Sequence, residues 1–249
     1  MYKKEIEQLE KEFKRIKNMG YVKSTRNGPT GIGKTFEDLL GKKEDALGLP
    51  DYKGIEIKTK RSYSNSYTTL FNATLHGQNN YETKRLCSCY GYPDKIIKDK
   101  KVLNVSFSVK PTLIANRFFF NLKVDHEAKK IYVIIKDRWN NLLENTVYWD
   151  FEDLKERLYT KMKYLALINA WPTTRNGEIY YRYDKISFYK LKSFEKFIEL
   201  IEKGIIRVSI KMGVIRSGEK KGMSHDRGTS FELKSLDFPL LFDHIQVYN

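Results

Sequence analysis

The sequence predicts an α/β fold in which a mixed sheet is flanked by helices. Apolar residues recur at helical spacing in residues 2–19, whereas residues 55–58 alternate between apolar and charged side chains as a strand does. Further strand-like runs occupy residues 102–109 and 117–137. A chain of 249 residues with 41% hydrophobic residues can bury a sizeable core, in one large domain or in two lobes that share an interface.

The charge of the chain points to a polyanionic partner. Its 46 Lys and Arg residues exceed its 31 Asp and Glu residues, which gives a formal charge of +15. This excess favours nucleic acid first and an anionic membrane second, and a generally basic protein is the alternative. No apolar run approaches the roughly 18 residues of a membrane span, and no signal peptide is apparent. We therefore expect a soluble, cytoplasmic protein without a membrane partner.

A helix and a glycine-rich stretch open the chain. Residues 2–19 form the predicted helix, with its apolar stripe in the core. Residues 28–35 match the spacing of a phosphate-binding loop, but no hydrophobic strand precedes them as that loop requires. Lys34 and Thr35 are instead candidates for contacts to a DNA phosphate. Thr35 is also expected to cap the next helix, which carries Glu37.

The strongest chemical signal lies in residues 50–58, which place an acid before a Gly turn and an alternating strand after it. Because side chains alternate along a strand, Glu56 and Lys58 share the face opposite to the apolar residues, and Asp51 can fold back toward them. Two carboxylates suit Mg²⁺, while the lysine can orient or deprotonate water and offset charge on a scissile phosphate. Glu37 is a candidate third carboxylate. The alternatives are a solvated strand face and an exposed Glu favoured by the helix dipole.

The residues that follow the motif supply further candidates for DNA contacts. Lys60 and Arg61 continue the strand into a basic, hydroxyl-rich stretch. His76 lies in a predicted loop near the expected scissile phosphate, although a plain loop histidine is an equal alternative. The two cysteines, Cys87 and Cys89, are too few for a tetrahedral zinc site, and we expect a reduced pair on a helix.

The rest of the chain alternates strands and helices. Residues 68–71 are expected to pair with the motif strand, and residues 125–129 to form a hairpin turn. The remaining predicted elements are helices at 151–163 and 194–203, and strands at 164–170, 179–183 and 205–213.

A cluster of hydrogen-bonding side chains follows the last of these strands. Arg and Lys can bond guanine O6 and N7, and Asp can accept from cytosine N4, so the cluster suits reading of G·C pairs in a major groove. A basic loop that holds only phosphates is the alternative. The candidates on the strand and in the loop are Arg207, Lys211, Arg216, Lys220, Lys221, His225, Asp226 and Arg227.

These motifs, taken in order, resemble the MvaI/BcnI restriction endonucleases and, more distantly, the MutH nicking enzyme. The resemblance rests on residues 30–40, the Lys43-Glu-Asp segment, Pro50-Asp-x4-Glu-Ile-Lys-Thr, residues 147–149 and residues 217–229. It implies a PD-(D/E)xK restriction-endonuclease-like fold with catalytic and recognition lobes. We expect the catalytic lobe to centre on about residues 1–110 and the recognition lobe to occupy mostly the C-terminal half, including 205–235.

The resemblance also assigns roles to the motif residues. Asp51 and Glu56 would ligate Mg²⁺, with one or two ions in each active site, Lys58 would be the catalytic lysine, and Glu37 the supporting helix acid. The chain departs from the family pattern at Arg227, where a His is expected, and at Lys211, where an Arg is expected.

The implied function is Mg²⁺-dependent hydrolysis of double-stranded DNA by a type II restriction endonuclease. The family resemblance suggests a short G/C-rich pseudo-palindromic site of the CC-N-GG type, such as CCWGG or CCSGG. It further suggests a prokaryotic monomer that nicks the two strands in turn and works beside a cognate DNA methyltransferase. A MutH-like strand-specific nicking endonuclease and a non-catalytic DNA-binding module are the alternatives.

Overall fold

The computed structural model describes residues 2–41 and 49–248, so the Lys43-Glu-Asp segment lies outside the described residues. The chain divides into two compact units. Unit 1 comprises Met1–Ser66, Leu158–Lys192 and Pro239–Asn249, and unit 2 comprises Tyr67–Arg157 and Ser193–Phe238. Residues 67–110 fall in unit 2, and the assignment of a catalytic lobe centred on about residues 1–110 stays a prediction.

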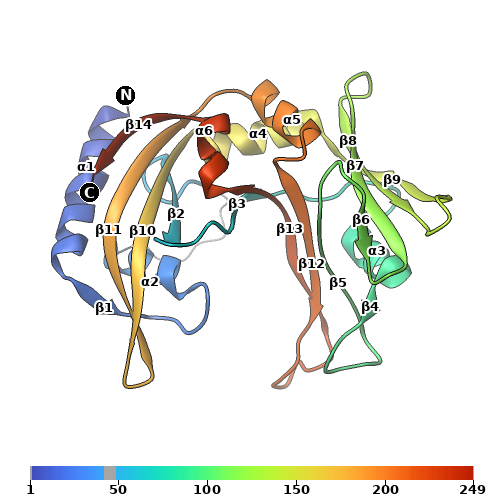
Figure 1. The fold of residues 1–249 in the computed structure, drawn as a ribbon, viewed down its shortest axis with the longest axis horizontal. Helices are drawn as coiled ribbons and strands as arrows, with labels where there is room; N and C mark the ends of the chain where they lie inside the picture. The colour runs from blue at the N-terminus through green and yellow to red at the C-terminus, as the bar shows by residue number, and fades with distance from the viewer. Residues whose placement is uncertain (1, 42–48, 249) are drawn as a thin grey trace. The chain divides into compact units, whose positions relative to one another are not determined.

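Unit 1 is built on a mixed sheet, as the sequence predicts (Figure 1). Strand β2 runs parallel to β10, and the other pairings are antiparallel. The strand order is β1 (Tyr21–Lys23), β11 (Glu178–Leu191), β10 (Tyr164–Arg175) and β2 (Glu56–Arg61), with β14 (Phe242–Tyr248) also paired to β11. Among the described residues, β2 therefore stands at one end of the strand order.

Helix α1 (Lys3–Asn18) covers one face of this sheet and confirms the first predicted helix. Its apolar stripe, Ile6, Leu9, Phe13 and Ile16, is buried in a core shared with residues of β10 and β11. Ile55 and Ile57 enter the same core, as the alternation predicts. The opposite face of β2 is therefore the face of Glu56 and Lys58.

Helix α2 (Gly31–Leu39) begins five residues earlier than predicted. Thr30, not Thr35, occupies the cap position, so the predicted cap is wrong. Thr35 is 1% exposed and accepts a hydrogen bond of 3.0 Å from the backbone of Thr25. The hydroxyl of Tyr183 donates to the carbonyl of Ile32 at 2.8 Å, which ties α2 to β11. The hydrogen bond from Thr25 explains why the Thr35 hydroxyl points into the protein.

Unit 2 contains two antiparallel sheets, shown with their helices in Figure 1. The first has the order β3 (Tyr67–Asn72), β13 (Ser224–Lys234), β12 (Arg207–Val214), β5 (Lys101–Phe107) and β4 (Tyr92–Pro93). The second has the order β6 (Thr112–Ile114), β7 (Phe118–Asp125), β8 (Lys130–Lys136) and β9 (Leu142–Asp150). The helical elements are α3 (Glu82–Tyr90), α5 (Phe194–Glu202) and η1 (Ser235–Asp237), while α4 (Phe151–Met162) and α6 (Phe238–Leu241) cross from one unit to the other along the chain.

The strand prediction was wrong in one pairing. Residues 68–71 lie in β3, which pairs with β13 rather than with β2. The neighbour of β2 is β10, whose residues 165–168 are all buried. A strand buried on both faces is suited to the interior of a sheet, and parallel pairing requires a long crossover. The chain between β2 and β10 provides that crossover by building most of unit 2.

The remaining local predictions agree with the structure. The hairpin turn at 125–129 joins β7 to β8, and α4 and α5 occupy their predicted positions. The Ser193 side chain caps α5 by accepting from the backbone of Lys196 at 3.1 Å. Cys87 and Cys89 lie on α3 as free thiols. Over the described residues, the helices are too short or too polar to cross a membrane.

Candidate active site

The acid–lysine motif (residues 50–58) folds as a tight turn followed by β2. Tyr52 and Ile55 exchange backbone hydrogen bonds of 2.9 and 2.8 Å, and both residues between them have positive φ. Such two-residue turns match the twist of the chain that flanks them. The turn folds Asp51 back, so that its Oδ2 accepts a hydrogen bond of 3.0 Å from the backbone N–H of Ile57. This is the fold-back that the sequence predicts.

Glu56 and Lys58 form a close, poorly hydrated ion pair. The Lys58 Nζ donates to Glu56 Oε1 at 2.6 Å, and the two side chains are 22% and 5% exposed. Burial of a carboxylate to this extent destabilises the fold unless the carboxylate is paired and hydrogen-bonded. The burial of Glu56 argues against a solvated strand face, which was the alternative for the motif.

A second lysine, which sequence reasoning missed, completes the surroundings of Glu56. Lys161, in the last turn of α4, places its Nζ 3.4 Å from Glu56 Oε2 and 2.7 Å from the carbonyl oxygen of Leu49. It therefore ties the chain just before Asp51 to the acid on β2. Lys161 is separated from Glu56 by 105 positions and lies on the basic side of the predicted helix, so the sequence pattern did not distinguish it from a solvent-exposed lysine.

The donor set of the motif fits a hard divalent cation. Asp51 and Glu56 offer carboxylate oxygens on the two sides of one turn, and Mg²⁺ takes one or two carboxylates together with water and substrate oxygens. In this structure Lys58 and Lys161 supply the positive charge beside Glu56. A cation held by the two acids would add to the positive charge beside Glu56.

Glu37 lies on α2, which packs beside the other face of β2. A Cβ added to Gly33, one turn before Glu37, would lie 3.2 Å from Thr59 Oγ1 and 3.9 Å from Glu37 Oε1. Thr59 alternates with Lys58 along the strand and so points to the opposite side. The role of Glu37 as a supporting acid stays a prediction.

The basic candidates near the motif differ in their accessibility. Lys34 is ion-paired with Asp38 on the same helix, and hydrogen bonds from Lys34 and Thr25 lower the pKa of Asp38. Thr35 is buried, as described above. Lys60 is half-buried and Arg61 is exposed. Arg61 thus stands open to a ligand, whereas Lys34 already has a partner.

In unit 2, the two predicted readers on β12 are held by a buried acid. Arg207 donates to Glu232 Oε2 at 3.1 and 2.9 Å, and Lys211 donates to Glu232 Oε1 at 2.7 Å. Burial would raise the pKa of Glu232, but hydrogen bonds from Lys211, Ser209 and Arg207 outweigh it, and the pKa lies below its usual value. The Arg207 guanidinium also stacks 3.5 Å from the centre of the Tyr67 ring. The structure thus orients both cations.

Arg216 is also engaged within unit 2. Its guanidinium bonds Asp94, with Nη2 and Oδ2 2.7 Å apart, and Asp94 is 2% exposed. Arg216 and the backbone N–H groups of Ile97 and Ile96 hold the pKa of Asp94 well below its usual range. This contact anchors the segment that leads into the predicted reading loop.

The other predicted readers lie open on unit 2. Residues 224–228, expected in a loop, belong to β13, and Asp226 accepts a hydrogen bond of 2.7 Å from the backbone of Gly228. The exposed candidates are Lys220, Lys221, His225, Asp226 and Arg227. Four of these five carry or can carry positive charge, which suits an anionic partner.

His76 belongs to a separate polar cluster in unit 2. Its backbone exchanges hydrogen bonds of 2.9 and 3.0 Å with Tyr148, and its Nε2 lies 2.8 Å from Asp153 Oδ2. Asp150 joins them, so that the three possible ligand atoms lie within 4.8 Å of one another. The histidine is thereby fixed at the end of β9, and its contact with DNA stays a prediction.

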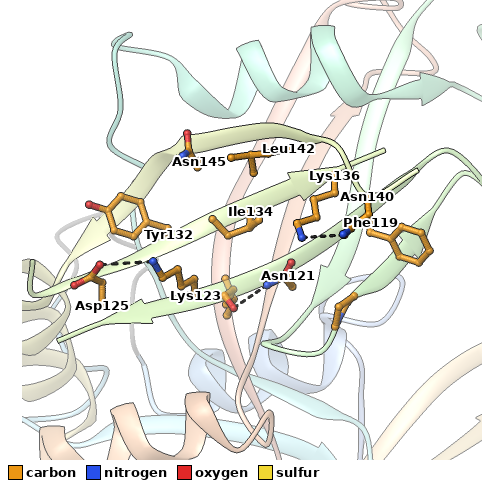
Figure 2. Close-up of a pocket in the computed structure, with 12 residues that line it drawn as sticks. Phe119, Asn121, Lys123, Asp125, Tyr132, Ile134, Lys136, Asn140, Leu142 and Asn145 are labelled. Carbon is orange, nitrogen blue, oxygen red and sulfur yellow. Dashed lines mark hydrogen bonds and ion pairs between the residues drawn. The ribbon is translucent and has the colours of Figure 1, made fainter. Parts of the chain in front are cut away.

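A hollow of about 860 Å³ lies on the sheet of β6, β7, β8 and β9 in unit 2 (Figure 2). Figure 2 shows its lining as a mixture of charged, asparagine, aromatic and aliphatic side chains, with Lys136 bonded to Asn140 at 2.9 Å. The acid–lysine motif is not part of this hollow. A duplex is a large rod and does not require an enclosed pocket for its phosphates.

Comparisons with known proteins agree with the motif. The model of the MvaI/BcnI restriction endonuclease family matches residues 10–242. A solved complex of restriction endonuclease MvaI with its cognate DNA substrate is 31% identical, with a TM-score of 0.88, and the match covers 97% of this chain and 96% of that chain. Restriction endonuclease MvaI in the absence of DNA is 30% identical, with a TM-score of 0.61 and coverage of 98% and 97%. The comparison with curated proteins finds no match.

The family model spans nearly the whole chain, and the structural likeness extends over both units and the motif. The chain therefore belongs to the MvaI/BcnI restriction endonuclease family and is a type II site-specific deoxyribonuclease.

Proposed function

We propose that this restriction endonuclease cleaves double-stranded DNA in a Mg²⁺-dependent reaction with Asp51, Glu56 and Lys58 as its catalytic residues. The observation that carries the proposal is the buried Glu56 carboxylate, bonded by Lys58 at 2.6 Å, with Asp51 folded back onto the same strand. A buried acid beside a phosphate would repel it, so this residue is not explained by DNA binding alone. The similarity to an MvaI structure determined with DNA supports the duplex as substrate.

The chemistry follows from these groups. Asp51 and Glu56 would hold Mg²⁺, which when bound polarises a phosphoryl oxygen and acidifies a water. Lys58 orients or deprotonates the attacking water and offsets the negative charge that develops on the scissile phosphate. Lys161 keeps Glu56 and the segment before Asp51 in place. In-line attack then leaves 5′-phosphate and 3′-hydroxyl ends.

The target is a short G/C-rich pseudo-palindrome of the CC-N-GG type. The exposed donors Lys220, Lys221, His225 and Arg227 reach guanine edges or phosphates, and Asp226 accepts from cytosine. Arg207 and Lys211 act from fixed positions because Glu232 orients them. The departures from the family pattern at residues 211 and 227 fall in this proposed reading surface, so the catalytic residues carry over from the family more directly than the target sequence does.

The enzyme acts as a monomer with one acid–lysine motif. It nicks one strand, then rebinds in the opposite orientation and cuts the other. A cognate DNA methyltransferase would protect the host sites.

The deciding experiment is digestion of a fully sequenced plasmid with Mg²⁺, against a control with EDTA, followed by sequencing of the new ends. Discrete Mg²⁺-dependent double-strand ends support the proposal and reveal the site. Nicks in one strand alone would instead indicate a MutH-like nicking enzyme. Tight binding without cleavage would indicate a non-catalytic module.

Two variants test the assignment of residues. Asp51→Asn and Lys58→Met are expected to lower the cleavage rate by about 10²-fold or more while duplex binding is retained. Lys11→Met is the matched control, because Lys11 is exposed on α1 in the same unit and its loss removes the same charge. Full activity of either motif variant would refute the assignment.

A further inference from the structure

A row of three polar side chains crosses unit 1 beside the motif. On β2, Lys60 follows Lys58 by two residues and so lies on the same face of the sheet. The residue paired with Lys60 on β10 is Asn169, and the residue paired with Asn169 on β11 is Lys185. Figure 1 shows these three strands side by side. The register is regular up to Asn169, so Lys60, Asn169 and Lys185 share one face.

The row places two lysines on one face of the sheet, on either side of Asn169. Lys60, Asn169 and Lys185 are each half-buried. Among the described residues, neither ammonium has a carboxylate within 4.0 Å, and no side-chain hydrogen bond involves any of the three. The nearest acid along β11, Asp184, is instead bonded by Ser62 at 3.2 Å and by the indole of Trp171 at 2.7 Å.

The row has the electrostatics of a site that favours an anion. Burial and the charge of Lys185 lower the pKa of Lys60. Two half-buried like charges on the same face of a sheet repel one another, and a counter-charge would lower this cost. A bound phosphate would relieve this repulsion, and the Asn169 amide between the lysines offers a further donor.

We propose that Lys60, Asn169 and Lys185 form a phosphate-binding site for the DNA strand, adjacent to the scissile phosphate. The inference rests on the proposed function, because it identifies the scissile phosphate with the site of Lys58. Two residues along a strand span about 6.6 Å, which is comparable to the spacing of neighbouring phosphates in one DNA strand. Lys58 and the row can therefore engage consecutive phosphates. Such a contact fixes the position of the strand and carries no sequence information.

The test is the salt dependence of duplex binding by Lys185→Gln. Binding is measured with Ca²⁺ in place of Mg²⁺, from about 50 to 200 mM salt, so that cleavage does not interfere. Log K falls as log salt rises, and each lost phosphate contact makes this negative slope shallower by about one. Lys185→Gln is expected to show the shallower slope together with weaker binding at low salt. Lys185→Arg is expected to retain the wild-type slope, because it keeps the charge.

Lys190→Gln is the matched control. Lys190 is exposed on the same strand, five residues further along and on the opposite face by alternation, and its loss changes the net charge equally. The control is expected to keep the wild-type slope. A wild-type slope for Lys185→Gln, or an equal loss for Lys190→Gln, would overturn the inference.

The outcome is separable from the proposed function. Mg²⁺-dependent cleavage by the wild type decides the function, whereas the difference between the Lys185 and Lys190 variants decides the phosphate site. Thermal unfolding of both variants is measured alongside, and a loss of slope in a Lys185→Gln protein that unfolds at the wild-type temperature supports a contact with DNA.

Discussion

Replacement of Lys161 by Met tests whether this residue supports the catalytic acids. The Lys161 Nζ bonds the Leu49 carbonyl at 2.7 Å and lies 3.4 Å from Glu56 Oε2, with the side chain 20% exposed. A hydrogen bond to a charged group contributes about 1.5–3 kcal/mol, so Lys161→Met should lower the free energy of unfolding by about that amount. Because Glu56 keeps Lys58 as a partner, the loss should not reach the larger cost of an unpaired buried charge.

Activity should fall together with stability. The segment before Asp51 loses its tie to Glu56, and a displacement that costs about 1.4 kcal/mol at the transition state slows cleavage about 10-fold. At the same time, removal of an ammonium beside Glu56 should increase the affinity for a divalent cation. Urea unfolding, single-turnover cleavage and calorimetric titration with Ca²⁺ measure the three effects.

Lys155→Met serves as the control for this experiment. Lys155 is exposed on the same helix, α4, so its loss removes an equal charge without touching the motif. Wild-type stability and wild-type single-turnover rate in Lys161→Met would refute the supporting role. A decrease in cation affinity would refute the electrostatic part of the reasoning.

Two further substitutions test the structure around the sites. Glu232→Gln should be less stable than wild type at pH 7 and should approach wild type as the pH falls below about 4. The folded pKa of Glu232 is lowered, so its stabilising effect is present above the unfolded pKa and is lost as the pH falls through the folded value. Urea unfolding at several pH values measures the difference in unfolding free energy between the variant and the wild type. A difference that does not change with pH would contradict the prediction. Gly54→Ala should cost about 1–2 kcal/mol from its φ of +87° and more from a contact 2.9 Å from the Tyr2 ring. Gly177→Ala has a φ of +77° with no neighbour within 4 Å, so an equal loss in both variants would rule out the contribution of Tyr2.

The grouping of the motif residues could be predicted because it is local. Alternation along a strand places Glu56 and Lys58 on one face, and the Gly54 turn returns Asp51 to them. Helical periodicity likewise predicted the buried stripe of α1. In both cases the relevant distances are set by backbone geometry within a few residues.

The partners of the predicted cations could not be read from the sequence. Arg207 and Lys211 alternate along β12 as candidate readers, but only the antiparallel pairing of β12 with β13 brings Glu232 beside them. Thr35 has the spacing of a phosphate-binding residue, yet the packing of α2 buries it. Burial and strand pairing decide these cases, and both depend on residues far away in the chain.

The sequence by itself determined the family, the α/β class and the identity of the acids and lysine in the motif, because short-range periodicity and motif order carry that information. The tertiary structure alone decided that Lys161 reaches Glu56, that β10 rather than β3 flanks β2, and that Lys185 lies in register with Lys60. These pairs are more than 100 residues apart, so their proximity arises only when unit 1 folds and brings α4, β2, β10 and β11 together.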